Sequence, residues 1–401
     1  MKILQINAVY GNGSTGVIVR DIQAECISNG IECICAYSSA KGEVEHGYHI
    51  GNRFTNKLHA LLTRISGKQG YFSFCSTWMF LRFLDACKPD IVHLHGLHSG
   101  FVNIPMLLKY LAKKQIRTIV TLHDCWFYTG GCTHYTAIGC DRWKTACGQC
   151  PKRYEEFPAL LWDSSARQLA DRAKLFGAIK NLTVVGVSKW ITAEAKAGIF
   201  KNANCITIHN GIDTDFFRPV QSDFRKRLGL ERKFVILAPA NKWLLLVNKE
   251  TFDVITGNMD EDMAIVFFGG IVPEGMLRPN MVFLGFIHSR EELREIYSAA
   301  DVMVNCSRED TLPTLMIEAQ ACGTPVVAYG NTGVRETVGE GCGYVVENGN
   351  PWEMLDKIRV IKRAGKGKYS KNCQEIIRMN FDKRRNYRQY VKLYNSITNL
   401  S

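Results

Sequence analysis

Short apolar strands alternate with helices along nearly the whole chain, and no other feature constrains the fold as strongly. Such runs, bounded by turn residues, are typical of strands buried on both faces of a parallel sheet. They are residues 2–9, 31–38, 90–95, 118–124, 181–188 and 205–209 in the first half, and 234–239, 264–270, 281–287, 301–305 and 324–329 in the second. This order predicts an α/β fold class with two doubly wound parallel sheets that face a cleft.

The length of 401 residues exceeds what one hydrophobic core usually organises, so we expect two domains. The turn-rich residues 210–219 and the segment 222–230 indicate a linker into the second domain. We predict an N-terminal domain over residues 1–205, which carries a cysteine-rich insert at 125–151. A C-terminal domain over 206–380 and a basic terminal helix over 381–401 complete the chain.

The charge and cysteine content bound the setting in which the protein works. Fifty Lys and Arg against 38 Asp and Glu give a formal net charge of +12, which favours anionic partners: nucleic acid, phosphorylated small molecules or an acidic membrane surface. No run of about 18 apolar residues predicts a transmembrane helix, and residues 1–9 are too short and strand-like for a signal peptide. Fifteen cysteines without an export signal indicate reduced thiols, so we expect a cytoplasmic protein.

Polar residues follow several predicted strands, at the ends where open α/β sheets bind ligands. The glycine-rich residues 11–16 come between the first strand and a helix expected from Val17. Such a turn can approach a phosphate, but it also suits an ordinary tight strand–helix connection. Two later strands end in histidine, which makes site candidates of the four residues His95, His98, His123 and Asp124.

Four cysteines in the insert, Cys132, Cys140, Cys147 and Cys150, have the spacing C-x7-C-x6-C-x2-C. Four thiolates within a short loop fit a tetrahedral structural Zn²⁺, with Cys147 and Cys150 as the close pair. Only that half of the motif has the C-x-x-C form. Unmetallated thiols therefore explain the pattern as well as zinc does, and an iron–sulfur or redox role is a third interpretation.

Residues 55–84 interleave basic side chains with apolar and aromatic ones. The basic residues are Lys57, His59, Arg64 and Lys68, and the apolar ones are Leu58, Leu61, Leu62, Ile65, Tyr71, Phe72, Phe74, Trp78 and Phe80. Such a face would suit a lipid surface or a lipid-linked acceptor. The alternative, which we favour from the sequence, is an amphipathic helix pair whose apolar side belongs to the core.

The most specific stretch is residues 305–338, which predicts a polar turn, a helix, a short strand and a second turn. Pro313 suits the first turn of the helix, and Gly323 ends it. Asp310 and Glu318 stand eight residues apart, on either side of the helix start. Carboxylates beside the exposed N–H groups of a helix N-terminus can hold polyhydroxyl and phosphate groups together.

These motifs together resemble the family 4 retaining nucleotide-sugar glycosyltransferases, which have the two-domain GT-B fold. The resemblance covers nearly the whole chain, and it is most specific at residues 310–327, which are similar to the family's E-x7-E segment followed by A-x-x-x-G-x-P-V-V. Further similar segments are residues 122–124, 209–213, 217–219 and 298–301. The cysteine insert with Trp126 resembles a subgroup associated with bacterial capsule, exopolysaccharide and O-antigen synthesis.

The resemblance implies a C-terminal helix that returns to the first domain, and it implies roles for matching positions. Glu318 would accept hydrogen bonds from the ribose hydroxyls of the donor, Asp310 would face the donor sugar, and Lys249 would neutralise the pyrophosphate. Gly13 and Ser14 would contact the phosphates or sugar, and His123 the transferred sugar. Leu312, Pro313 and Thr314 at the helix start would lie at the phosphates. Phe286 and Ile287 would border the base.

The implied reaction transfers a hexose from a UDP- or GDP-sugar to a glycan or lipid-linked acceptor, with retention and at the inner face of the plasma membrane. Departure of the nucleoside diphosphate leaves negative charge on the β-phosphate, which cations and N–H dipoles stabilise. No D-x-D signature is in a position to bind a catalytic metal. No nucleic-acid-binding motif accompanies the positive charge, so we expect no nucleic-acid partner.

Two positions depart from the family pattern. The first acidic position is Asp310 instead of Glu, which leaves Glu309 as another carboxylate for the sugar. Asn248 replaces the first residue of the usual Arg-Lys pair, which leaves Lys242 as a substitute cation. These departures keep two alternatives open: a nucleotide-sugar epimerase of GT-B fold, and a catalytically weak glycan- or nucleotide-binding homologue.

Overall fold

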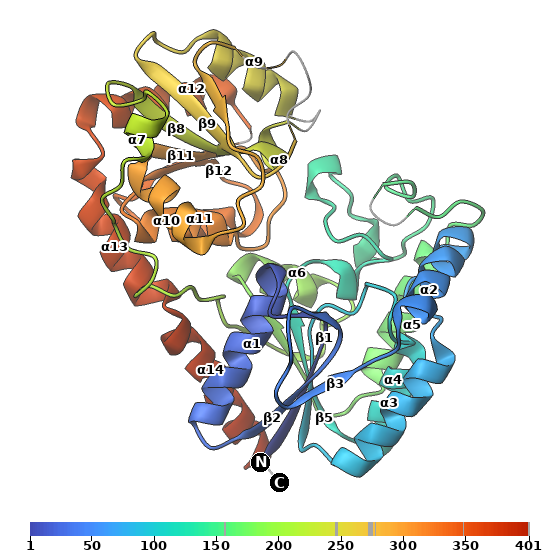
Figure 1. Cartoon of the computed structure of the whole chain (residues 1–401). Helices are drawn as coiled ribbons and strands as arrows, with labels where there is room; N and C mark the ends of the chain where they lie inside the picture. The colour runs from blue at the N-terminus through green and yellow to red at the C-terminus, as the bar shows by residue number, and fades with distance from the viewer. Residues whose placement is uncertain (156–157, 245–247, 272–275, 277, 348, 400–401) are drawn as a thin grey trace. The chain divides into compact units, whose positions relative to one another are not determined.

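A computed structural model describes the chain except for residues 156–157, 245–247, 272–275, 277, 348 and 400–401. The chain forms two units, Met1–Asn210 with Arg384–Ser401, and Gly211–Lys383 (Figure 1). Each unit is built around one parallel sheet, so the α/β fold class with two doubly wound sheets is confirmed. No described helix combines the length and the hydropathy needed to cross a bilayer.

The first unit contains a seven-stranded sheet of order β3-β2-β1-β4-β5-β6-β7, all parallel. Every residue of the central strand β4 is buried, as expected for a strand with helices on both faces. The strands are β1 (Lys2–Tyr10), β2 (Glu32–Ala40), β3 (Gly47–His49), β4 (Ile91–Leu94), β5 (Arg117–Leu122), β6 (Leu182–Gly186) and β7 (Asn204–Thr207).

The helices of the first unit are α1 (Gly13–Ser28), α2 (Arg53–Ser66), α3 (Phe74–Cys87), α4 (Ile104–Lys114), α5 (Ser165–Gly177) and α6 (Lys189–Ala197), with α14 (Lys383–Thr398) from the chain end. Helix α1 begins four residues before the predicted Val17. The Asn12 side chain caps it by accepting the N–H of Gly13, so the glycine-rich turn is itself the first helical turn.

Helices α2 and α3 confirm the predicted helix pair, and the favoured interpretation of their apolar side holds only in part. Phe80 on α3 is fully buried and belongs to the core, as predicted. Phe54, Leu58 and Leu61 on α2 and Phe74 and Trp78 on α3 are exposed, with 46–75% of each side chain accessible. These residues do not belong to the core. The buried face of α2 is instead centred on His59, because polar side chains there find hydrogen-bond partners inside the unit.

The last helix returns to the first unit, as predicted. Tyr387, Tyr390 and Tyr394 on α14 are buried with Ile3 and Ile22 in one apolar cluster. The predicted start at residue 381 was too early. Phe381 ends the preceding helix, and Asp382 has an extended backbone that bridges to Ile212, which interrupts the helical hydrogen bonds.

The second unit contains a six-stranded parallel sheet of order β10-β9-β8-β11-β12-β13. Its strands are β8 (Phe234–Pro239), β9 (Met263–Phe268), β10 (Met281–Phe283), β11 (Val302–Asn305), β12 (Val326–Tyr329) and β13 (Gly343–Val346). Its helices are α7 (Phe224–Arg227), α8 (Ala240–Trp243), α9 (Lys249–Gly257), α10 (Arg290–Ala299), α11 (Thr314–Ala321), α12 (Pro351–Ala364) and α13 (Gly367–Phe381). Pro313 caps α11 instead of lying in its first turn, and Gly323 follows the helix with φ +78°.

Candidate active site

In each sheet the strand order reverses beside the first strand, and ligands of open α/β sheets bind outside the carboxyl ends of the strands at that point. In the first unit the reversal lies between β1 and β4, and in the second between β8 and β11. Gly13 and Ser14 follow β1, and His95 and His123 follow β4 and β5. Asp310 follows β11. Each unit therefore carries its predicted residues at its own reversal point or beside it.

Histidines at the ends of β4 and β5 form a hydrogen-bonded line that begins inside the first sheet. His95 Nε2 lies 3.1 Å from Gln5 Oε1, and His95 Nδ1 lies 3.0 Å from His123 Nε2. The amide nitrogen of Gln5 donates to the carbonyl of Val19, so its oxygen faces His95 as an acceptor. Burial and two neighbouring histidines lower the pKa of His95 well below its usual value, so His95 is neutral and donates a single N–H, to Gln5.

This line assigns the tautomer of His123. Because His95 Nδ1 can only accept, His123 carries its proton on Nε2 and leaves Nδ1 unprotonated. Burial lowers the pKa of His123 to about 4, so the ring is neutral at pH 7. A neutral imidazole with an unprotonated Nδ1 can accept a hydrogen bond from a hydroxyl group. The neighbouring Asp124 accepts the N–H of Trp126 and lies 3.8 Å from His98.

Gly13 and Ser14 lie in the first turn of the 16-residue helix α1, directly after β1. Both are exposed. Gly13 has φ +64°, and this left-handed backbone favours glycine. Crowding is not the reason, because no atom lies within 4 Å of the position that a Cβ would take. The N-terminal end of a helix attracts anionic groups, so this turn suits a phosphate or a sugar hydroxyl.

The turn between β11 and α11 presents Asp310, Leu312, Pro313 and Thr314 in the second unit. Thr332 holds it, because the Thr332 hydroxyl donates to the carbonyl of Asp310 at 2.5 Å. The Asp310 carboxylate lies 3.9 Å from the ammonium of Lys242, which follows β8. Lys242, proposed from the sequence as a substitute cation, thus faces the carboxylate predicted for the donor sugar.

Glu318 lies in the second turn of α11 and is partly buried. The hydroxyl of Tyr297, a fully buried residue of α10, donates to Glu318 Oε2 at 3.0 Å and orients the carboxylate. Burial raises the pKa of Glu318 to about 7, although Tyr297 and Arg290 lower it. An oriented carboxylate of this kind can accept hydrogen bonds from vicinal hydroxyls. Tyr297 had no sequence signal beyond its place in an amphipathic helix.

Lys249 occupies the first position of α9, is exposed, and forms an ion pair with Asp253 at 2.5 Å. Among the described residues, no hydrogen bond or ion pair joins the Lys249 side chain to another predicted site residue. Its neighbour Asn248 is fully buried and connects two loops at the reversal point. The Asn248 amide nitrogen donates to the carbonyl of Lys242 at 2.7 Å, and its oxygen accepts Arg308 Nε at 3.3 Å.

Arg308 is therefore a cation that sequence reasoning missed. The Asn248 side chain holds the Arg308 guanidinium in the segment after β11. The available signal was a basic residue two positions before Asp310, within a turn already singled out.

We expect Arg308→Ala to weaken donor binding by about 10- to 100-fold, because a charge-assisted phosphate contact is worth about 1.5–3 kcal/mol. Titration calorimetry with a nucleoside diphosphate and with the matching nucleoside checks this. The diphosphate should lose affinity and the nucleoside should not. Arg335→Ala, which removes an exposed arginine paired with Glu347, is the matched control. Equal diphosphate affinity in wild type and Arg308→Ala would exclude this role.

Phe286 and Ile287 follow β10 at the carboxyl edge of the second sheet. Phe286 is 61% exposed, and Ile287 is partly buried. The loops after β9 and β10 are joined where the N–H of Gly269 donates to the carbonyl of Gly285 at 2.7 Å. An exposed aromatic ring at this edge can stack on a base, which is the contact predicted for it.

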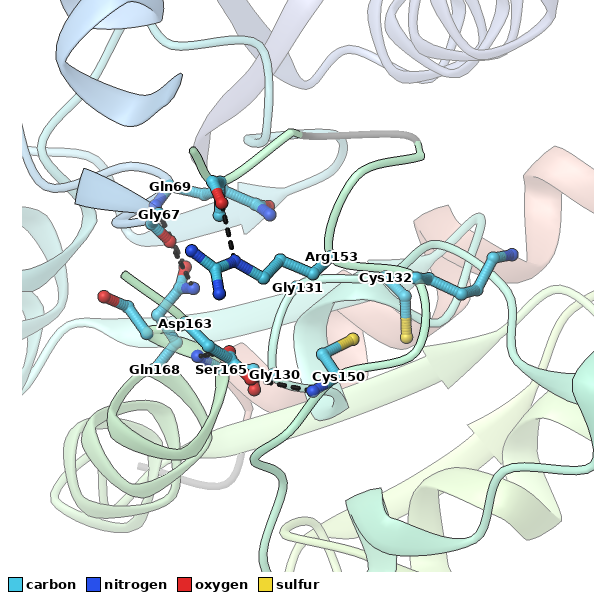
Figure 2. A pocket seen from close by; sticks show the side chains of 13 residues that line it. Gly67, Gln69, Gly130, Gly131, Cys132, Cys150, Arg153, Asp163, Ser165 and Gln168 are labelled. Carbon is cyan, nitrogen blue, oxygen red and sulfur yellow. Dashed lines mark hydrogen bonds between the residues drawn. The ribbon is translucent and has the colours of Figure 1, made fainter. Parts of the chain in front are cut away.

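Zinc binding by Cys132, Cys140, Cys147 and Cys150 stays a prediction. Among the residues that the structure describes, no group of three or more His, Cys, Asp or Glu side chains is placed to hold a metal ion. Burial raises the pKa of Cys147 to about 11 and also raises that of Cys150, so both are protonated thiols at pH 7. All fifteen cysteines are free thiols, which agrees with the expected reduced state. Of the four cysteines, only Cys132 and Cys150 line the small cavity of about 40 Å³ in Figure 2.

Aromatic packing and a buried arginine contribute to holding the cysteine-rich insert. Arg172 of α5 is 4% exposed and stacks 3.6 Å from the ring centre of Trp126. Its guanidinium donates to the carbonyls of Trp126 and Thr129. Asp163 accepts the N–H groups of Cys150 and Ser165, which closes the loop beside the cavity (Figure 2). These contacts give the insert a structural core of its own.

Comparison with known proteins decides the family. The model of Glycosyltransferase Family 4 matches residues 15–216, and the model of Glycosyl transferases group 1 matches residues 247–362. The chain belongs to glycosyltransferase family 4. The family predicted from the sequence is thus confirmed, and so is the class of enzyme.

Individual relatives of this family 4 glycosyltransferase agree over its full length. The Escherichia coli K12 protein named as the colanic acid biosynthesis glycosyl transferase WcaC is 24% identical over 378 residues, which cover 90% of each chain. Sucrose-phosphate synthase from Thermosynechococcus elongatus superposes with a TM-score of 0.71 at 17% identity, covering 100% of both chains. Anabaena HepE, solved with UDP-glucose, gives a TM-score of 0.65 at 16% identity and covers 99% of this chain and 100% of its own. These structures share the GT-B fold with this chain.

Proposed function

We propose that the enzyme transfers a hexose from a nucleotide-sugar to a glycan or lipid-linked acceptor in capsule, exopolysaccharide or O-antigen synthesis, with retention and without a catalytic metal. The observation that carries this proposal is the carboxylate of Glu318, oriented by Tyr297 on the helix that follows the reversal point of the second sheet. The name of WcaC supports the polysaccharide setting. The UDP-glucose in the HepE structure supports a nucleotide-sugar donor.

The proposed chemistry divides the donor among the residues of the second unit. Glu318 accepts the ribose hydroxyls, and Phe286 and Ile287 border the base. Arg308, Lys249 and the N–H groups at the start of α11, beginning with Thr314 because Pro313 has no N–H, meet the pyrophosphate. Negative charge grows there as the glycosidic bond breaks. Fixed cations and N–H dipoles stabilise that charge in the transition state more than in the ground state.

For the transferred sugar, the proposed polar contacts are given for each unit by itself. Asp310, with Lys242 beside it, accepts hydroxyl hydrogen bonds from the sugar. From the first unit, His123 Nδ1 accepts a sugar hydroxyl, and Gly13 and Ser14 contribute backbone N–H groups. Because His123 is neutral, it orients the sugar without adding charge near the anomeric carbon. We further propose peripheral contact with the inner face of the plasma membrane, where a lipid-linked acceptor would be presented.

Donor hydrolysis in the absence of acceptor tests this function. The purified protein is incubated with UDP-, GDP- and dTDP-sugars, and products are identified by mass spectrometry. Slow release of one free hexose with its nucleoside diphosphate is the expected result. Appearance of an epimeric sugar nucleotide would identify an epimerase instead. Binding without turnover, even with a membrane extract as acceptor source, would overturn the catalytic proposal in favour of a binding homologue.

A further inference from the structure

Helix α2 exposes apolar side chains on its outward side, where an ordinary surface helix carries polar ones. Its outward side carries Phe54, Leu58 and Leu61, spaced i, i+4 and i+7 so that they form one apolar stripe. Its inward side carries the buried His59, whose Nδ1 lies 2.8 Å from the Ser73 hydroxyl. An apolar stripe that faces away from the core contributes nothing to folding, and it indicates a binding surface.

The exposed apolar surface continues beyond α2. The N–H groups of Leu160 and Leu161 donate to the carbonyls of Arg64 and Ile65 at the end of α2, which fixes this loop beside the stripe. Leu160, Leu161 and the following Trp162 are each 57–60% exposed. Figure 1 shows α2 and α3 following one another along one side of the first unit. Of the 17 large apolar side chains exposed in the described chain, ten lie in residues 54–79 and 154–162.

The charge on α2 and the first turns of α3 has one sign. Residues 50–84 contain five Lys and Arg and not a single Asp or Glu. Arg53, Lys57 and Arg64 are all exposed and follow one edge of the stripe, since they are spaced by four and seven residues. The guanidinium of Arg82 lies 5.4 Å from the ring centre of the exposed Trp78. Aromatic and aliphatic side chains match the acyl-chain boundary of an anionic bilayer, and the cations beside them match its charged headgroups.

We propose that this docking surface, formed by α2, the first turns of α3 and residues 160–162, binds the surface of an anionic lipid bilayer. Phe54, Leu58 and Leu61 enter the headgroup–acyl boundary, and Lys57 and Arg64 lie at the level of the lipid phosphates. Uniform charge argues against a second copy of this chain as the occupant, because two such surfaces would repel each other. Docking explains how a protein without a described membrane-spanning helix reaches a membrane-borne substrate.

The docking surface also adjoins an open groove of about 980 Å³ at the carboxyl ends of β1, β2 and β3. Arg53 and Lys57 belong to both, and the other polar lining includes Tyr37, Ser38, His49 and Asn56. Docking therefore brings a polar, cationic groove to the headgroup layer. If the proposed transferase function holds, the acceptor that suits this groove is a glycan carried on an anionic lipid phosphate.

Flotation with vesicles tests the docking. The full chain is mixed with phosphatidylcholine vesicles that contain phosphatidylglycerol, and with pure phosphatidylcholine vesicles. We expect binding to the first that weakens as salt rises. Lys57→Gln combined with Arg64→Gln should lower it by about 25-fold, roughly fivefold per cation. Leu58→Glu combined with Leu61→Glu should lower it by more than about tenfold.

Trp352→Glu is the matched control, because it places a carboxylate at an exposed apolar side chain of the second unit. It should bind vesicles like wild type. Absence of wild-type binding to anionic vesicles, or unchanged binding by both double variants, would overturn the docking. A dimer in sedimentation velocity that the leucine variant dissociates, without vesicle binding, would assign the surface to self-association. Thermal melting shows whether both double variants are folded. Donor hydrolysis by the leucine variant, measured without vesicles, is independent of these outcomes and shows whether only one of the two proposals fails.

Discussion

Replacing Glu318 with alanine is expected to reduce donor affinity by about 100-fold or more and to abolish measurable turnover. Hydrogen bonds to a charged group are worth about 1.5–3 kcal/mol each, and the proposed role includes at least one ribose hydroxyl held by this carboxylate. Alanine also leaves the buried Tyr297 hydroxyl without its partner. Calorimetry with the nucleoside diphosphate and hydrolysis of the donor identified in the panel measure the two effects.

Glu375→Ala provides the control for this experiment, because it removes an exposed carboxylate from α13 in the same unit. Its affinity and turnover should equal those of the wild type. Near-normal turnover by Glu318→Ala would remove Glu318 from the donor site, and the proposal would then lose the observation that carries it.

The raised pKa of Glu318 gives this prediction a pH signature. Because burial moves the pKa to about 7, the carboxylate is mostly protonated at pH 6 and mostly ionised at pH 8. If the ionised form holds the ribose, affinity should increase over this range in wild type and stay flat in Glu318→Gln. Stability should change in the opposite direction. A folded-state pKa above the usual 4.5 favours the protonated form, so wild type should lose stability relative to Glu318→Gln as pH rises from about 4.5 through 7.

Replacing His123 with alanine is expected to lower kcat by about 100-fold, as is typical when a group that positions the reacting substrate is lost. The line from Gln5 through His95 leaves the buried Nδ1 of His123 unprotonated, so this nitrogen can only accept a hydrogen bond. With a pKa of about 4, His123 stays neutral across the working range. Any fall in the wild-type rate near pH 6.5 should therefore also be present in His123→Ala. Steady-state kinetics from pH 5 to 9 measure both the drop and the profile.

His93→Asn separates this effect from simple loss of stability. His93 is as buried as His95, but its nitrogens contact Tyr394 and Thr121 instead of His123. The variant should melt at a lower temperature and keep most of its kcat once folded. If it loses kcat as His123→Ala does, the histidines act only through the fold of the first unit, and His123 has no positioning role.

The fold could be predicted from the sequence where strands are buried on both faces. Residues 234–239 were predicted as a strand and are β8. A strand buried on both faces needs a continuous run of apolar residues, and such a run is visible in the sequence. Helix ends were less accurate. Asn12 caps α1 inside a glycine-rich turn, and Asp382 interrupts what looked like a single terminal helix. Both depend on one side-chain or backbone contact that spacing does not reveal.

The candidate site could be predicted only in part. Positions that match a motif, such as Glu318 and Asp310, could be predicted because the proposed chemistry needs those groups at that spacing. Arg308 was missed because its relation to Asn248 spans 60 residues and exists only after β8 and β11 become neighbours. The cysteine spacing predicted a metal site but gave no sign of the contact between buried Arg172 and Trp126, which joins residues 46 positions apart. The apolar pattern of α2 was correctly seen but assigned to the wrong side, since periodicity identifies a face and not its direction.

Helix α14 sets the order in which a newly made chain can mature. The first unit is synthesised up to Asn210, but the tyrosines of α14 that complete its apolar cluster follow only after the 173 residues of Gly211–Lys383. At about 5–20 residues per second, a ribosome needs roughly 10–35 seconds to make that stretch. Throughout this interval the nascent sheet keeps an uncovered apolar face. Premature termination between Lys383 and Tyr387 would therefore leave a finished second unit attached to a first unit that chaperones and proteases recognise.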